Sequence, residues 1–139
     1  MEFNNLATAD PRTCISGKVM RLNRITANIF RKYLSPFNIT DSQLTVLFIL
    51  SKMGGKKQKE LSDIMVMEKS TLNRNLQRLV ERGLLTKDEF PLIQATQAGK
   101  KLANEMVPEW QKAMNEIQNL LGNEGEQALD LVLHQLQNN

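Results

Sequence analysis

The sequence predicts a mainly α-helical protein with one small β-hairpin, and three observations support this fold class. Apolar residues recur three or four positions apart in several segments, which is the spacing of amphipathic helices. Two short segments rich in apolar and β-branched residues flank an Asp-Glu-Phe-Pro turn at residues 88–91. The chain has 139 residues, of which 41% are hydrophobic, enough for the core of one ordinary domain.

The first half of the chain is predicted to hold two helices. Residues 15–34 have one apolar stripe and form the first helix. Thr40 and Gln43 have capping-box spacing at the start of the second helix, and glycines at 54–55 end it. Because this second helix is apolar on most sides, we expect it at the centre of the core.

The middle of the chain has the order of a winged helix-turn-helix. Two short helices at 57–65 and 70–82 are joined by three residues, and Gly83 closes the second. Two strands at 84–87 and 92–95 complete a hairpin. We therefore predict a winged helix-turn-helix core over residues 41–96.

The last third is predicted to be helical. Thr96 is a candidate N-cap for a helix to about residue 121 that bends at Pro108, and Gly122 separates it from a final helix. The whole chain, 1–139, forms one domain in which helices 15–34 and 97–137 expose much apolar surface. Pairing with a second copy would bury that surface, which we favour over helices that fold back on their own core.

Charge is unevenly distributed although the net charge is only +3. Residues 1–55 and 56–87 each carry a balance of +4, whereas residues 88–139 carry −5. A basic region of this kind is typical of proteins that bind polyanions, and a solvated surface is the alternative.

The predicted helix 70–82 has two chemically different faces. On a helical wheel Thr71, Arg74, Asn75, Arg78 and Arg82 share one side, which contains no acid, and leucines occupy the other. Arginine and asparagine can pair with two acceptor or donor groups on guanine and adenine, and the helix start and nearby lysines can bind phosphate. The candidate DNA-binding residues are Lys57, Lys59, Lys69, Ser70, Thr71, Asn73, Arg74, Asn75, Arg78 and Lys87.

Several short motifs occur in a recognisable order along nearly the whole chain, although none is specific by itself. They are Ile39-Thr40-x-x-Gln43, Glu60-Leu61-Ser62, Lys69-Ser70-Thr71-Leu72-Asn73-Arg74, Leu79, Gly83-Leu84-Leu85 and Thr96-x-x-Gly99. In this order and spacing they resemble the MarR family of winged helix-turn-helix regulators. The resemblance implies a cytoplasmic homodimer, a transcriptional repressor with interlocked terminal helices and a recognition helix in each major groove of a pseudo-palindromic operator. It also implies a cleft that can hold a small aromatic effector, with Met and Phe side chains as candidate lining. For the methionines we favour the alternative, that they fill the core.

The wing departs from the family pattern. Its tip is Asp88-Glu89-Phe90-Pro91, without the arginine that usually enters the minor groove, so we predict no minor-groove contact. A protein-interaction module that binds little or no DNA is therefore the alternative function.

Other kinds of site have less support in the sequence. Cys14 is a candidate redox residue, but Phe30 and Asp41 stand where related sensors place tyrosines, and we favour a structural role. One histidine and one cysteine give no zinc ligand set, and we expect no cofactor and no catalytic constellation. The N-terminus lacks a secretory signal pattern and no apolar run is long enough for a membrane span, so we expect a cytoplasmic protein.

Overall fold

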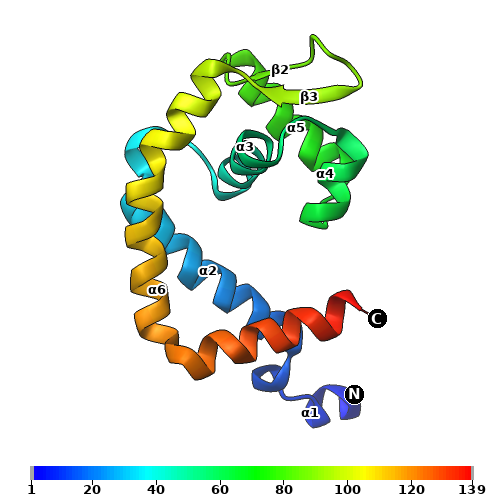
Figure 1. Ribbon diagram of the computed structural model, residues 1–139. Helices are drawn as coiled ribbons and strands as arrows, with labels where there is room; N and C mark the ends of the chain where they lie inside the picture. The colour runs from blue at the N-terminus through cyan, green and yellow to red at the C-terminus, as the bar shows by residue number, and fades with distance from the viewer. Residues whose placement is uncertain (1, 139) are drawn as a thin grey trace. The chain divides into compact units, whose positions relative to one another are not determined.

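The structure, a computed structural model, describes residues 2–138 and is mainly helical with one small sheet (Figure 1). The predicted fold class is confirmed. The elements in chain order are α1 (Asn4–Thr8), the 3₁₀ helix η1 (Pro11–Thr13), α2 (Ile15–Leu34), the 3₁₀ helix η2 (Ser35–Phe37), α3 (Asp41–Met53), β1 (Lys56–Lys57), α4 (Gln58–Met65), α5 (Lys69–Glu81), β2 (Leu85–Thr86), β3 (Leu92–Ala95) and α6 (Gln97–Gln137).

The described residues form two compact units. One unit is Tyr33–Lys112, which holds the helix-turn-helix and the sheet. The other combines the described residues up to Lys32 with those from Ala113 onward, and so contains most of α2 and the second part of α6.

Helix α3 is the centre of the Tyr33–Lys112 unit, as predicted. Thr40 is its N-cap: the Thr40 hydroxyl accepts a hydrogen bond from the Gln43 amide, and the Gln43 side chain accepts one from the Thr40 amide. Val46 and Leu47 are fully buried. The capping box satisfies two backbone donors at the helix start, which fixes where the core helix begins.

Helices α4 and α5 form the predicted helix-turn-helix. The turn between them is closed by Ser62, whose hydroxyl donates to the Met67 carbonyl at 2.6 Å and whose carbonyl accepts from the Met67 amide at 3.1 Å. Leu61 of α4 is fully buried, whereas Ile64 is 46% exposed. The packing of α4 on the core therefore depends on one side of a two-turn helix.

The sheet has three strands rather than the two of the predicted hairpin, in the order β1-β3-β2. Strand β1 pairs antiparallel with β3, so that Lys56 lies opposite Ile93, and β2 pairs with the other edge of β3. A two-residue strand of lysines has no alternating pattern that could have revealed it. This extra strand joins the start of α4 to the wing.

Helix α6 begins as predicted, because the Thr96 hydroxyl accepts a hydrogen bond from the Gly99 amide at 3.0 Å. The helix contains Pro108 and extends beyond residue 121 to Gln137. Its non-helical backbone angles lie at Gly122, with φ 66° and ψ 178°, which confirms the predicted break there. Glycine tolerates this conformation without steric cost.

The unit that contains α2 exposes many large apolar side chains on its helices. Within the described residues, no helix combines the length and apolar character that a membrane crossing requires. The exposed residues include Ile15, Val19, Met20, Leu22 and Ile25 of α2 and Leu120, Leu129, Leu131, Val132, Leu133 and Leu136 of α6.

Candidate nucleic-acid interface

Helix α5 presents one buried face and one polar face. Leu72, Leu76 and Leu79 are fully buried against the core. On the other side the Asn73, Arg74 and Arg78 side chains are exposed, and Thr71 is half-buried. The helix is therefore anchored by its leucines while its basic side is open to solvent, as the helical wheel predicts.

The start of α5 leaves backbone donors available. Glu68 occupies the N-cap position but makes no side-chain capping bond. Lys69 and Ser70, in the first turn, are exposed. Amide groups at a helix N-terminus carry partial positive charge and lack partners within the helix, so this end of α5 suits a phosphate oxygen.

The three lysines predicted outside α5 lie in the same unit but differ in their surroundings. Lys57 is exposed at the end of β1, and its backbone amide donates to the Glu60 carboxylate at 3.1 Å. Lys59 faces Asp63 at 3.7 Å in an exposed ion pair, which is weak in water. Lys87 is half-buried just after β2. Lys57 has no such ion pair among residues 2–138 and is exposed, which makes it the best suited of the three to a phosphate contact.

Asn75 of α5 and Arg82, the residue that follows the helix, are engaged away from the open face. Asn75 is half-buried and its side-chain amide lies 3.8 Å from the Met67 sulfur, a weak contact. Arg82 follows α5, and its guanidinium donates to the carbonyls of Asn38 and Phe37 at 2.7 and 3.3 Å. Arg82 therefore departs from the face it shares with Arg74 on the wheel, which a sequence reading could not reveal.

The wing tip is short and acidic. Asp88, Glu89 and Phe90 are exposed, and Phe90 is 79% accessible. The turn is closed by hydrogen bonds from the Phe90 amide to the Lys87 carbonyl and from the Leu92 amide to the Glu89 carbonyl, both 3.0 Å. Nothing at this tip offers a cation to a minor groove.

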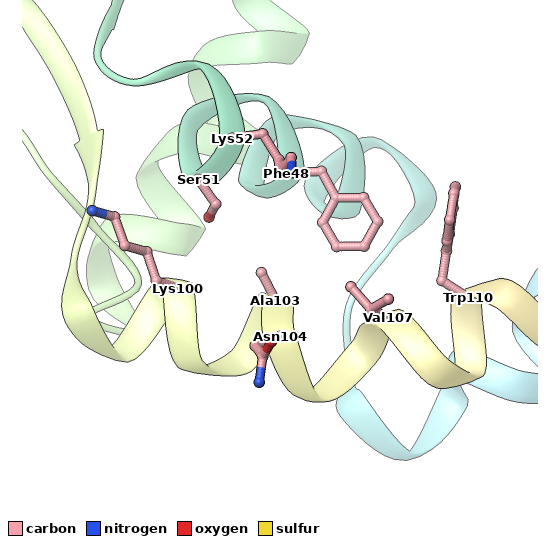
Figure 2. A pocket seen from close by; sticks show the side chains of 8 residues that line it. All are labelled: Phe48, Ser51, Lys52, Lys100, Ala103, Asn104, Val107 and Trp110. Atoms are coloured by element: carbon pink, nitrogen blue, oxygen red, sulfur yellow. The ribbon is translucent and has the colours of Figure 1, made fainter.

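A half-open cavity of about 480 Å³, which the sequence did not locate, lies between α3 and the first part of α6. Figure 2 shows Trp110 at one end and Lys100 at the other, with Phe48 across from Val107. The Phe48 and Trp110 rings pack edge to face, with their centroids 5.7 Å apart. Phe48 fits the expected lining, but no methionine lines the cavity; its lining is Phe48, Ser51, Lys52, Lys100, Ala103, Asn104, Val107 and Trp110.

The polar groups of this cavity favour an anionic ligand. The charged residues of its lining are Lys52 and Lys100, and the lining contains no acidic residue. The Ser51 hydroxyl is buried and has no hydrogen-bond partner in the described residues. A buried hydroxyl without a partner costs free energy that a polar ligand group can recover.

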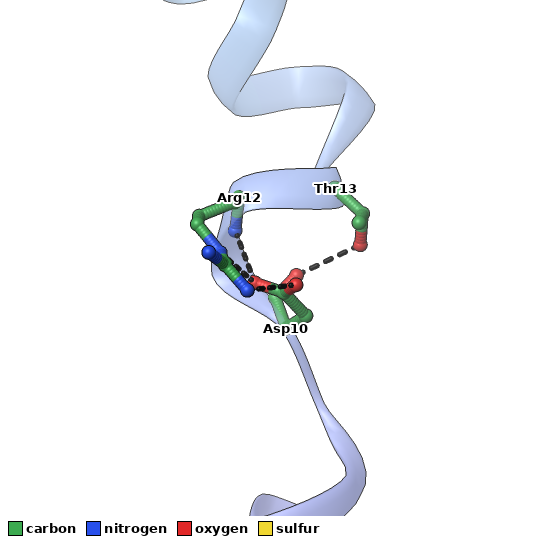
Figure 3. Close-up of polar contacts among 3 residues, drawn as sticks. All are labelled: Asp10, Arg12 and Thr13. Atoms are coloured by element: carbon green, nitrogen blue, oxygen red, sulfur yellow. Dashed lines mark hydrogen bonds and ion pairs between the residues drawn. The ribbon is translucent and has the colours of Figure 1, made fainter.

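Cys14 lies immediately before α2 and is exposed. Its sulfur accepts a hydrogen bond from the Gly17 amide at 3.4 Å. Arg12, the cation nearest in sequence, instead binds the Asp10 carboxylate through its side chain and backbone, while the Thr13 hydroxyl donates to the Asp10 carbonyl (Figure 3). The Arg12 hydrogen bonds hold the pKa of Asp10 below its ordinary value. The Arg12 guanidinium is thus paired with Asp10 in an exposed ion pair.

Comparison with known proteins agrees with this architecture. Residues 37–91 match the model of the MarR family. No curated protein matches the sequence. These 55 residues contain the helix-turn-helix and most of the wing.

Solved structures match over almost the full chain. BpsR of Bordetella bronchiseptica is 20% identical, with a TM-score of 0.84 over 94% of this chain and 98% of that one. Reduced MarR of E. coli is 21% identical, with a TM-score of 0.70 over 96% and 98%. NadR in complex with 4-hydroxyphenylacetate is 25% identical, with a TM-score of 0.75 over 88% and 94%. The winged core at residues 37–91 therefore matches the MarR family of regulators, and the chain shares the fold of solved MarR-family structures.

Proposed function

We propose that this regulator is a cytoplasmic homodimer that binds duplex DNA sequence-specifically and represses transcription until a small aromatic ligand releases it. The acid-free face of α5 carries the proposal. Arg74 and Arg78 are exposed on a helix whose opposite face is fully buried. A helix that is anchored on one face and carries exposed arginines on the other suits base reading in a major groove.

The proposed DNA contacts divide by role. Asn73, Arg74 and Arg78 would read base edges, because they extend from the exposed side of α5. The first turn of α5 and the nearby lysines would bind phosphates. Asn75 stays in the set but is half-buried. The phosphate-binding group is Lys57, Lys59, Lys69, Ser70, Thr71 and Lys87.

The proposed domain organisation follows from where apolar side chains remain exposed. Helices 15–34 and 97–137 would form the dimer interface, and residues 41–96 the DNA-binding core. Ile15 and Leu120 are each more than 70% exposed. Burial of such side chains contributes about 25 cal/mol per Å² of apolar surface, which favours a second copy of the chain as partner. A twofold dimer requires a pseudo-palindromic operator.

The proposed effector is a hydroxylated aromatic carboxylate. The cavity offers the Phe48 and Trp110 rings for stacking, lysines for a carboxylate and the unpartnered Ser51 hydroxyl. Among the structural neighbours, DNA binding by BpsR is regulated by 6-hydroxynicotinic acid, and NadR is solved with 4-hydroxyphenylacetate. Each of these ligands combines an aromatic ring with a carboxylate, the two groups that the rings and lysines of the cavity can bind.

Selection of duplexes from a random pool with the purified protein tests the proposal and yields the operator. Affinity for that duplex should fall steeply as salt rises, because bound phosphates release counterions. Arg74→Ala should cost about 1–3 kcal/mol on the operator and relax base preference at one position. Lys57→Ala should weaken operator and scrambled duplex alike, and lower the salt slope by about 1.

Two outcomes would contradict the proposal. If no duplex is retained at low salt, a protein-interaction module is the better description, favoured by the exposed Phe90 on an acidic wing. If Arg74→Ala binds the operator as the wild type does, α5 does not present this arginine to bases.

A redox role for Cys14 is a second candidate because the thiol is exposed. Peroxide treatment should then change operator affinity in the wild type and leave Cys14→Ser unaffected. Equal affinity before and after treatment would leave Cys14 a structural residue.

A further inference from the structure

The carboxyl-terminal end of α5 is held by a long-range contact to the segment that follows α2. The Arg82 guanidinium donates to the carbonyls of Asn38 and Phe37, two residues more than 40 positions earlier in the chain. Both carbonyls lie at the end of the 3₁₀ helix η2, and Asn38, its C-cap, has left-handed backbone angles, φ 51° and ψ 51°. Carbonyls at the end of a helical turn lack internal partners, so a planar guanidinium that spans both is a good match.

The same end of α5 is also tied to the first turn of α6. The Thr96 hydroxyl donates to the Gly83 carbonyl at 2.6 Å, and the Thr96 amide donates to the Leu84 carbonyl at 3.1 Å. A Cβ atom on Gly99 would lie 2.1 Å from the Leu84 carbonyl oxygen, so the backbones approach too closely for any other residue. The segment that follows α5 is therefore already fixed to the start of α6, and Arg82 lies directly before it.

The Arg82 contact fixes the same end of α5 to a second element, the segment that follows α2. A recess of about 520 Å³ separates the η2 segment from the last turn of α5, and Arg82 bridges it. Without this bridge the last turn of α5 would be held to the rest of the core by its leucines and by Thr96. Helix ends with few buried contacts are where local opening begins.

We propose that Arg82 is a positioning residue, which sets the angle of the recognition helix by fixing its last turn to the segment after α2, and is not a phosphate-binding residue. This inference rests on the proposed DNA-binding function. It assigns a structural cause to base specificity, because side chains on a tilted helix reach the wrong base edges while the total positive charge stays the same. A lysine at position 82 would carry the same charge, but its single ammonium group lacks the planar fork that spans two carbonyls.

The test compares Arg82→Lys and Arg82→Gln with Lys101→Gln, a control that removes one positive charge from an exposed position on α6. Binding of the full-length protein is measured on the selected operator and on a scrambled duplex over a range of salt. Both Arg82 variants should lose roughly tenfold on the operator, the size of effect expected when coupling between packed elements is lost. Affinity for the scrambled duplex should fall no more than in Lys101→Gln, and the salt slope of Arg82→Lys should equal that of the wild type.

A phosphate contact predicts the opposite pattern. Arg82→Lys would then bind the operator as the wild type does, while Arg82→Gln would weaken on both duplexes and lower the salt slope by about 1. That pattern would overturn the proposal, as would operator binding unchanged in both variants.

Amide hydrogen exchange tests the positioning role of Arg82 separately from the proposed DNA-binding function. In Arg82→Lys the amides of Arg82, Gly83 and Leu84 should exchange faster, while those of the α3 core stay protected. Unchanged exchange at these amides overturns the positioning role. If the wild type binds no duplex, the DNA-binding function fails, and the exchange result alone decides whether Arg82 fixes the helix. If Arg82→Gln does not fold, Arg82→Lys carries the comparison.

Discussion

Val66 is a β-branched residue at a backbone position that such residues rarely occupy. It ends α4 with φ 50° and ψ 49°, and its side chain is 79% exposed. The left-handed region costs most L-residues about 1–2 kcal/mol, whereas asparagine and glycine tolerate it. The turn of the helix-turn-helix therefore carries strain that no buried contact of Val66 offsets.

Val66→Asn should consequently raise the free energy of unfolding by about 0.5–1 kcal/mol, because asparagine relieves most of the strain without the entropy cost of glycine. Chemical denaturation at one fixed protein concentration measures the change, since a dimer's stability depends on concentration. Ile64→Asn is the control: it makes a similar change in polarity at a helical position of α4 and should destabilise. A Val66→Asn protein that is less stable than the wild type would mean that the Val66 side chain makes a contact that outweighs the strain.

Among the elements of the winged core, the wing has an acidic tip although the exposed face of α5 is basic. Asp88 and Glu89 lie on the exposed tip of the β2–β3 hairpin. If the tip approaches DNA, its carboxylates repel phosphates, and this repulsion weakens as salt screens it.

The double variant Asp88→Asn, Glu89→Gln should therefore bind every duplex about two- to tenfold more tightly at low salt, with a smaller gain at high salt. Fluorescence anisotropy with operator and scrambled duplexes measures both. The double variant Glu105→Gln, Glu124→Gln removes two exposed acids from α6 and so controls for the same change in net charge. Equal gains in the double variant and the control would place the wing tip away from the duplex.

Elements with strong periodic or capping signals could be predicted from the sequence, and those defined by distant pairing could not. The bounds of α2, the Thr40 capping box and the break at Gly122 all follow from local chemistry. Strand β1 depends on pairing with β3, which no local pattern records. For the same reason the exposed face of α5 was predictable, but the side chain of Arg82 was not, because its acceptors are distant in sequence.

The cavity shows the same limit at the scale of the molecule. Its lining comes from α3 and α6, about 50 residues apart, and no motif joins Phe48 to Trp110. Trp110 is the only tryptophan of the chain, so its fluorescence reports directly on this cavity. The cavity is therefore open to a measurement that needs no label.

A hydroxylated aromatic carboxylate, with 4-hydroxyphenylacetate and salicylate as probes, should change Trp110 fluorescence saturably and weaken operator binding. Thermodynamic linkage requires that operator DNA weaken the ligand by the same factor, typically about 5- to 150-fold. Lys100→Gln should reduce affinity for the carboxylates but not for the corresponding neutral phenols, whereas Lys101→Gln, outside the lining, should change neither. A ligand that alters Trp110 fluorescence without weakening operator binding would occupy the cavity without regulating the protein.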